Sequence, residues 1–261
     1  MGRRTASMQE LLSAHFDYAM ADVYTSMPGV VVAVRDMGEM YVDVQPSLNM
    51  RTENEEIVSS RPPIMNVPLQ LPISTKGGLT FPVSVGDPVW LMFSMRGLDT
   101  WKRSSGVSVT PSDMRKFDIR DCCAIPGTYP MGSSPNSAGK RSNAHSPDDV
   151  VLVHNIGGSE TEIRLKPSGD IEINSPTNVK IKCVSASIES DSTNIDTGNM
   201  TVNSDSFVVN SGTVAISATT SAEMNASFNM TGSFVLNGTA VEDHTHGGVL
   251  VGDSRTGEFG E

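Results

Sequence analysis

The residues best suited to chemistry lie near the end of the chain, in the run Val241-Glu242-Asp243-His244-Thr245-His246-Gly247-Gly248. In an extended strand, His244 and His246 point to the same side. Neutral imidazole binds first-row transition metals, and six imidazoles from three copies would form a two-layer octahedral cage that suits iron(II), nickel or cobalt better than zinc. The bare pattern also fits a solvated turn. The metal hypothesis therefore depends on an element that brings three copies together.

Residues 167–240 supply such an element, because apolar residues recur there in pairs spaced two apart. Most successive pairs begin about six to nine residues apart, with Asn, Asp, Ser, Thr and Gly between them, a pattern typical of short strands joined by tight turns. Each pair places two side chains on one face of a strand. The pairs are Ile171/Ile173, Val179/Ile181, Ala186/Ile188, Met200/Val202, Phe207/Val209, Val214/Ile216, Met224/Ala226, Phe228/Met230 and Phe234/Leu236.

A ribbon of this kind buries too little apolar surface alone, since ordering each residue costs about 1 to 2 kcal/mol of backbone entropy. Three copies around a closed symmetry axis would bury the pairs and leave no long strand edge exposed. We therefore predict a homotrimer with an intertwined trimeric β-helix over residues 167–240. A single-chain solenoid fits less well, because its coils need about 20 or more residues. A disordered tract fits less well because it lacks regular apolar residues.

The N-terminal half has a different pattern. Ser7 and Glu10 form a capping box that predicts a helix within residues 1–27, ended by Pro28-Gly29. Residues 28–130 predict a small barrel of the oligonucleotide/oligosaccharide-binding (OB) type. Its strand candidates are residues 30–34, 40–44, 67–73 and 89–93, the last predicted to be buried on both faces. Residues 131–166 are assigned to a linker, with a domain boundary in the polar run 131–149, and residues 241–261 to the apex. The expected fold class is all-β.

Composition excludes several functions. The net charge of −11 opposes binding to nucleic acid, which requires clustered cations. The apolar runs are too short to cross a bilayer, and the absence of an apolar signal core predicts synthesis in a cytoplasm. Three cysteines without metal-type spacing, Cys122, Cys123 and Cys183, are expected to be reduced, buried packing residues.

Two further stretches carry a family resemblance. They are Pro82-Val83-Ser84-Val85-Gly86-Asp87-Pro88-Val89-Trp90-Leu91-Met92-Phe93-Ser94 with Leu98-Asp99-Thr100-Trp101, and Asp243-His244-Thr245-His246-Gly247-Gly248. Together with the repeat, they make the chain resemble the membrane-piercing central spike proteins of contractile-tailed bacteriophages. The resemblance implies a virion protein at the tail baseplate tip. It also implies attachment to the tail hub, piercing of the host outer membrane, and one iron ion per trimer held by His244 and His246.

Other functions were weighed against this one. A spike of a related contractile secretion system has the same architecture. A barrel that captures nucleic acid or oligosaccharide is a further alternative; the acidic charge opposes nucleic acid, and the few aromatics Trp90, Phe93 and Trp101 do not support a ligand-binding face. A glycan-degrading tail enzyme would need paired carboxylates in a groove. The acids of the repeat are scattered, which predicts a solvating role at turns and no enzymatic activity. They are Asp170, Glu172, Glu189, Asp191, Asp196, Asp205 and Glu223.

The first prediction concerns the metal. Purified protein should contain one transition metal, expected to be iron, per three chains, and the double substitution His244→Ala, His246→Ala should remove it while the trimer persists. Binding requires neutral imidazoles with an ordinary pKa of about 6.5, so occupancy should fall as the pH drops toward 5. Elemental analysis measures the stoichiometry, and metal retained in the double variant would exclude this site.

Overall fold

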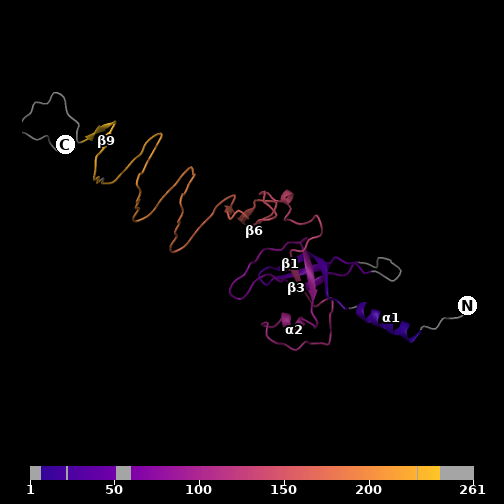
Figure 1. The fold of residues 1–261 in the computed structure, drawn as a ribbon. Coiled ribbons are helices and arrows are strands. Elements are labelled where there is room, and N and C mark those ends of the chain that lie inside the picture. The colour runs from indigo at the N-terminus through magenta and orange to yellow at the C-terminus, as the bar shows by residue number, and fades with distance from the viewer. Residues whose placement is uncertain (1–6, 22, 51–59, 228, 242–261) are drawn as a thin grey trace, which may run out of the picture. The chain divides into compact units, whose positions relative to one another are not determined.

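A computed structural model describes residues 7–21, 23–50, 60–227 and 229–241 (Figure 1). It divides into two units, Met1–Ala186 and Ser187–Glu261. Apart from short helices, the regular elements are strands, so the predicted all-β class is confirmed. The division falls after Ala186, whereas the sequence placed a boundary within residues 131–149.

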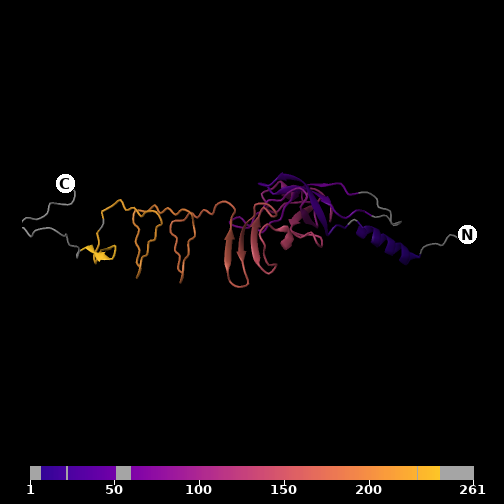
Figure 2. The same ribbon diagram turned by 90° about the horizontal axis from the view of Figure 1, so that it is seen from above.

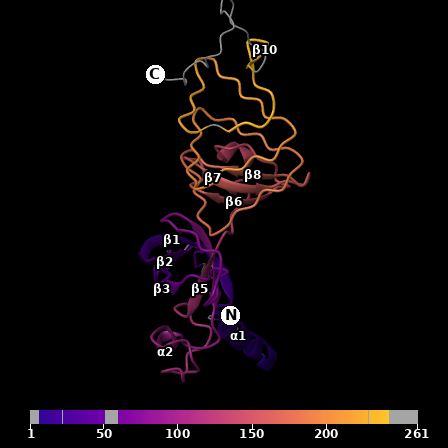
Figure 3. The same ribbon diagram turned by 90° about the vertical axis from the view of Figure 1, so that its left-hand side faces the viewer.

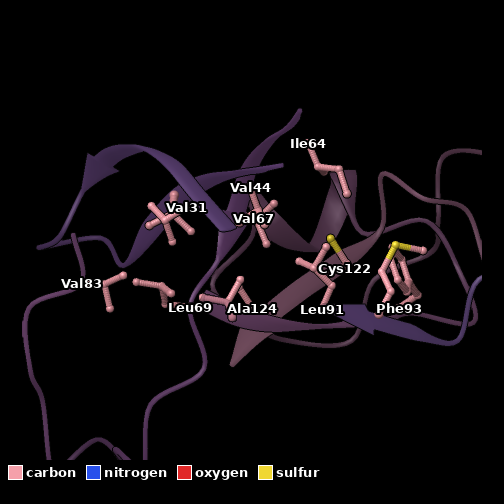
Figure 4. Close-up of a cluster of buried hydrophobic side chains, with 13 residues drawn as sticks. Val31, Val44, Ile64, Val67, Leu69, Val83, Leu91, Phe93, Cys122 and Ala124 are labelled. Atoms are coloured by element: carbon pink, nitrogen blue, oxygen red, sulfur yellow. The ribbon is translucent and has the colours of Figure 1, made fainter. Parts of the chain in front are cut away.

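The first unit contains a curled five-stranded antiparallel sheet with the order β3-β2-β1-β4-β5. Its strands are β1 (Ser26–Asp36), β2 (Tyr41–Pro46), β3 (Ile64–Pro68), β4 (Pro88–Phe93) and β5 (Cys122–Pro126). The two ends of the sheet meet where Leu69 bridges Ala124 and the Gln70 amide donates to the Ala124 carbonyl at 2.8 Å. Inward-facing residues such as Val31, Val44, Val67 and Leu91 fill the interior (Figure 4).

Three of the predicted strands are confirmed, since residues 30–34, 40–44 and 89–93 coincide closely with β1, β2 and β4. The candidate 67–73 overlaps only the end of β3, and β5 was not predicted. The expectation that residues 89–93 are buried on both faces is wrong. Val89, Leu91 and Phe93 are buried, but Trp90 and Met92 are exposed on the outer face. An antiparallel sheet commonly keeps one face in contact with solvent, which explains the alternation.

Helix α1 (Met8–Ala21) precedes the sheet and begins at the predicted capping box. The Ser7 amide donates to Glu10 Oε2 at 2.7 Å, and the Glu10 amide donates to Ser7 Oγ at 3.2 Å. The helix has no buried residue. A short second helix, α2 (Asp99–Lys102), lies between β4 and β5.

Residues 131–166, assigned to a linker from the sequence, contain regular structure. The 3-10 turn η1 (Ala138–Lys140) is followed by β6 (Val150–His154) and β7 (Thr161–Leu165), which pair with β8 (Ile171–Asn174) in a three-stranded antiparallel sheet. Figures 2 and 3 show these strands side by side. The strands were missed because β6 directly follows the polar, turn-rich run 131–149, whose composition favoured a linker for the whole segment.

The second unit is described from Ser187 to Val241, except for residue 228. Its described strands are β9 (Val235–Leu236) and β10 (Thr239–Ala240), which form a hairpin. Between Ser187 and β9 the chain passes back and forth in wide turns (Figure 1). A strand is defined by hydrogen bonds to a neighbour, and a trimeric helix would take those neighbours from other copies. The trimeric β-helix therefore remains a prediction.

The cysteines are all free, but only one fits the expected buried packing role. Cys122 lies in the core of the curled sheet, Cys123 is half-buried on its outer face, and Cys183 is exposed. The expectation of burial is therefore wrong for Cys183, which lies in a stretch whose side chains are exposed in the single chain.

Gly29 provides a test of the sheet packing. A Cβ added there would lie 2.5 Å from Val44 Cγ1 and 3.2 Å from Leu91 Cδ1, so Gly29→Ala should destabilise the sheet by about 1 to 3 kcal/mol through overpacking. Gly77→Ala is the matched control, because an added Cβ at Gly77 meets no atom within 4 Å. Denaturant unfolding of both variants measures the difference. Equal stabilities would show that β1 does not approach β2 and β4 this closely.

Candidate functional site

The sheet β6–β8 has two faces with opposite chemistry. One face is apolar, with direct cross-strand pairs Val150↔Leu165, Leu152↔Ile163, Ile163↔Ile173 and Leu165↔Ile171. These six side chains are between 41% and 68% exposed. An exposed, contiguous apolar face is uncommon on a monomeric protein and indicates an interaction surface.

The other face carries buried charges. Glu162 and Arg164 alternate with Ile163 along β7, so both point to this face, where Glu162 is only 1% exposed. Arg141 from the preceding loop donates to Glu162 Oε2 at 2.9 Å and to Glu160 Oε1 at 3.2 Å. Arg164 pairs with Glu162 and also with Glu172 of β8 at 3.3 Å. A buried charge is tolerated only when it is paired in this way.

Glu160 is the acid with the most marked pKa shift in this network. Burial tends to raise its pKa, but the backbone donors of Gly157, Asn143 and Ser142 and the charge of Arg141 outweigh burial and lower the pKa to about 2. The amides of Gly157 and Asn143 donate to its two oxygens at 2.8 and 3.0 Å. Glu160 is therefore ionised across the ordinary pH range. Its contacts with Arg141 and the Asn143 amide connect the loop to the β6–β8 sheet.

The loop 131–149 covers the charged face through these contacts. His145, which had no predicted role, is 8% exposed and its Nε2 lies 3.0 Å from Asn136 Oδ1. Because the loop and the ion pairs close one face, the apolar face is the one available to a partner. Sequence reasoning missed this network, although the alternation Glu162-Ile163-Arg164-Leu165 contains its signal: a strand with one charged and one apolar face.

The exposed apolar pattern continues beyond β8. Large apolar side chains of the predicted pairs remain mostly solvent-exposed, including Ile181 at 80%, Val202 at 52% and Phe207 at 74%. The accessible surface of the chain is 22161 Å². A folded monomer of its mass, 27.9 kDa, would expose about 11,000 Å². The single chain thus leaves about twice that surface uncovered.

The predicted metal ligands His244 and His246 lie outside the described residues, so their geometry is not tested. Within the part that is described, no group of three or more His, Cys, Asp or Glu side chains is placed to hold a metal ion. The same described part has no helix that is long and apolar enough to span a membrane. Among the acids expected at turns, Glu172 is an exception, because it lies in β8 and pairs with Arg164 and Lys166.

Residues 27–127, which include the curled sheet, match the family model described as the N-terminal domain of phage protein Gp138. That match supports a phage structural protein of the tail or baseplate. None of the curated proteins compared with the chain matches it. The match covers the curled sheet and ends before the β6–β8 sheet and the repeat, so the roles of those parts are inferred from their own surfaces.

Glu160→Gln tests the charged face. The substitution removes one charge opposite Arg141 and should cost about 3 to 5 kcal/mol at pH 7, the usual penalty for breaking a buried pair. Because the folded pKa is depressed, the stabilisation exists above the ordinary carboxyl pKa near 4.5 and is lost as the pH falls toward 2. The variant should therefore show a flatter dependence of stability on pH between 5 and 2.

The measurement is unfolding of the full chain by denaturant as a function of pH. Glu189→Gln is the matched control. Because Glu189 is exposed, this substitution should leave the dependence of stability on pH unchanged. Parallel curves for the wild-type protein and Glu160→Gln would contradict the assigned role.

Proposed function

We propose that the chain is a non-enzymatic structural spike of a contractile phage tail, active as a homotrimer. In this proposal residues 150–240 of three copies wind into a β-helical shaft. The curled sheet acts as the platform that attaches to the tail hub, and the shaft pierces the host outer membrane when the tail contracts. The observation that carries the proposal is the continuous exposure of large apolar side chains from Val150 to Leu236 in the single chain.

Association of three copies would bury the apolar side chains that the single chain leaves exposed. Burial of apolar surface contributes roughly 25 cal/mol per Å², so the large apolar side chains that the single chain leaves in water represent an unused driving force for association. Identical partners present the same repeat at the same spacing, and a closed ring of them leaves no unpaired strand edge. The proposed shaft starts at Val150 and not at residue 167, because the apolar face of β6–β8 has the same character as the repeat.

The platform role rests on the curled sheet. Its order β3-β2-β1-β4-β5, closed between Leu69 and Ala124, is compatible with a five-stranded barrel of the OB type. The match of residues 27–127 to a phage domain favours a phage tail over a secretion apparatus. At the far end, His244 and His246 from three chains would hold one iron ion, whose chemistry there is structural: six nitrogen ligands fasten the chain ends together.

Substitution of exposed apolar residues tests the assembly. Wild-type protein should have the mass of three chains by light scattering. Ile181→Asp and Val202→Asp should abolish trimers, because three carboxylates would meet on a dry axis at several kcal/mol each. In an isolated chain the same substitutions would be harmless, since both positions are more than half exposed.

Asn194→Asp is the matched control, because it adds the same negative charge at an exposed turn position and should leave the trimer intact. A wild-type monomer at micromolar concentration, or trimers in all three variants, would remove the basis of the proposal.

In the phage that encodes the chain, antibodies to the shaft should label the distal tail tip. Particles carrying Val202→Asp should adsorb to cells without infecting them.

A further inference from the structure

Two apolar surfaces of the N-terminal part have no role in the shaft. The first is α1, whose apolar side chains Leu11, Leu12 and Phe16 are between 56% and 65% exposed. With Met8, His15 and Ala19 they fall within one broad sector of the helix, opposite Ala14 and Asp17. A capped helix with an uncovered apolar face is stabilised mainly by whatever packs against that face.

The second surface is a groove of about 550 Å³ on the outside of the curled sheet. It lies between the outer face of β4 and β5, the segment after β3, and α2. Its lining is almost wholly apolar and includes Leu71, Ile73, Met92, Leu98, Trp101 and Cys123. Ile73, Met92 and Trp101 are each more than 40% exposed. The volume lies within the range of about 300 to 1,000 Å³ that is usual for ligand-binding pockets.

We propose that α1 of one copy binds the groove of the neighbouring copy. An amphipathic helix in an apolar groove is a common recognition mode, with anchors at i and i+4, here Leu12 and Phe16. The charges are complementary as well. Between Met8 and Ala21 the helix carries Glu10 and Asp17 and no Lys or Arg, whereas Lys102 and Arg103 directly follow the groove residue Trp101 in the chain and line a neighbouring cavity.

The restraints at the end of α1 favour a neighbour over the same chain. The Val23 amide donates to the Met20 carbonyl at 3.1 Å, and the Tyr24 amide donates to the Phe117 carbonyl at 3.0 Å. The Tyr24 ring also packs on Phe93, with centroids 5.6 Å apart. Reversal of a helix onto its own sheet usually takes a loop of about 2 to 6 residues, and here the connection is fixed from Val23 onward. A helix from another copy has no such restraint.

This arrangement is heterologous, since α1 and the groove are different surfaces of the same chain. Repeated around a threefold axis, it closes into a ring in which every helix and every groove is used once. The inference rests on the proposed homotrimer. It adds contacts between copies at the curled sheet, and these contacts do not depend on the shaft.

Cys123 provides a native reporter in the groove. In a Cys183→Ser background, Ala19→Cys places a thiol on the apolar side of α1, and Ala14→Cys places the same thiol on the opposite side. A short bismaleimide should convert Ala19→Cys protein to covalent dimers and trimers on a denaturing gel, at least tenfold more than Ala14→Cys protein. Burial raises the pKa of Cys122 to about 12 and that of Cys123 to a lesser degree, so Cys122 stays unreactive at pH 8.

Two added substitutions identify the contact. Cys123→Ser should abolish the cross-link, and Phe16→Glu should reduce it at least tenfold without changing the trimer mass by light scattering, because the shaft still holds the copies together. Equal cross-linking of Ala14→Cys and Ala19→Cys, linkage confined to single chains by peptide mass analysis, or no linkage in a protein of trimer mass would overturn the inference alone. A wild-type protein of monomer mass would overturn the proposed function with it.

Discussion

The burial of exposed apolar side chains is the constraint on which the remaining structure depends. In the first unit the curled sheet buries its own core, so this part can be understood from one chain. Among the described residues from Val150 to Val241, most large apolar side chains are exposed to solvent in the single chain. A sequence that repeats Ile, Val, Phe and Met this regularly predicts that these side chains are buried in the functional state. In the proposed trimer, the other copies of the same chain present the matching repeat that would bury these side chains.

The buried ion pairs on the charged face of β6–β8 select one arrangement of the loop and the sheet more than they add to the free energy of unfolding. A buried pair gains little over a hydrophobic substitute, but an unpaired buried charge is costly, so such networks favour one arrangement over its alternatives. Arg141, Glu160 and Glu162 can be satisfied only when the loop 131–149 lies on the charged face. The apolar face is then left open. A one-residue slip of β7 would place Glu162 and Arg164 on the apolar side, which the network excludes.

The sequence predicted what depends on local pattern. The capping box at Ser7 and Glu10 and the strands β1, β2 and β4 follow from spacing, and the structure has them. It did not predict β5 or the outward direction of Trp90 and Met92, because an apolar run does not reveal whether its second face is covered. The ion network was missed because Arg141 lies some 20 residues from its partners, in a segment whose composition indicates a linker. For His244 and His246, which lie outside the described residues, the hypothesis rests on their spacing, on the repeat that precedes them and on the family resemblance.

The charge distribution is compatible with the proposed packing of a chain of net charge −11 against copies of itself. Between Lys182 and Arg255 there is no Lys or Arg, so the charged side chains of the repeat beyond Lys182 are all acidic. Its acids Glu189, Asp191, Asp196, Asp205 and Glu223 are exposed. Glu189 and Glu223 directly adjoin a predicted apolar pair, so in a strand their side chains point away from the neighbouring Ile188 and Met224. If the pairs face the axis, the carboxylates face water, where a Debye length of about 8 Å at physiological salt screens copy from copy. The same acidic outer surface would resist anionic lipid headgroups, so a shaft of this kind would cross a membrane without adhering to it.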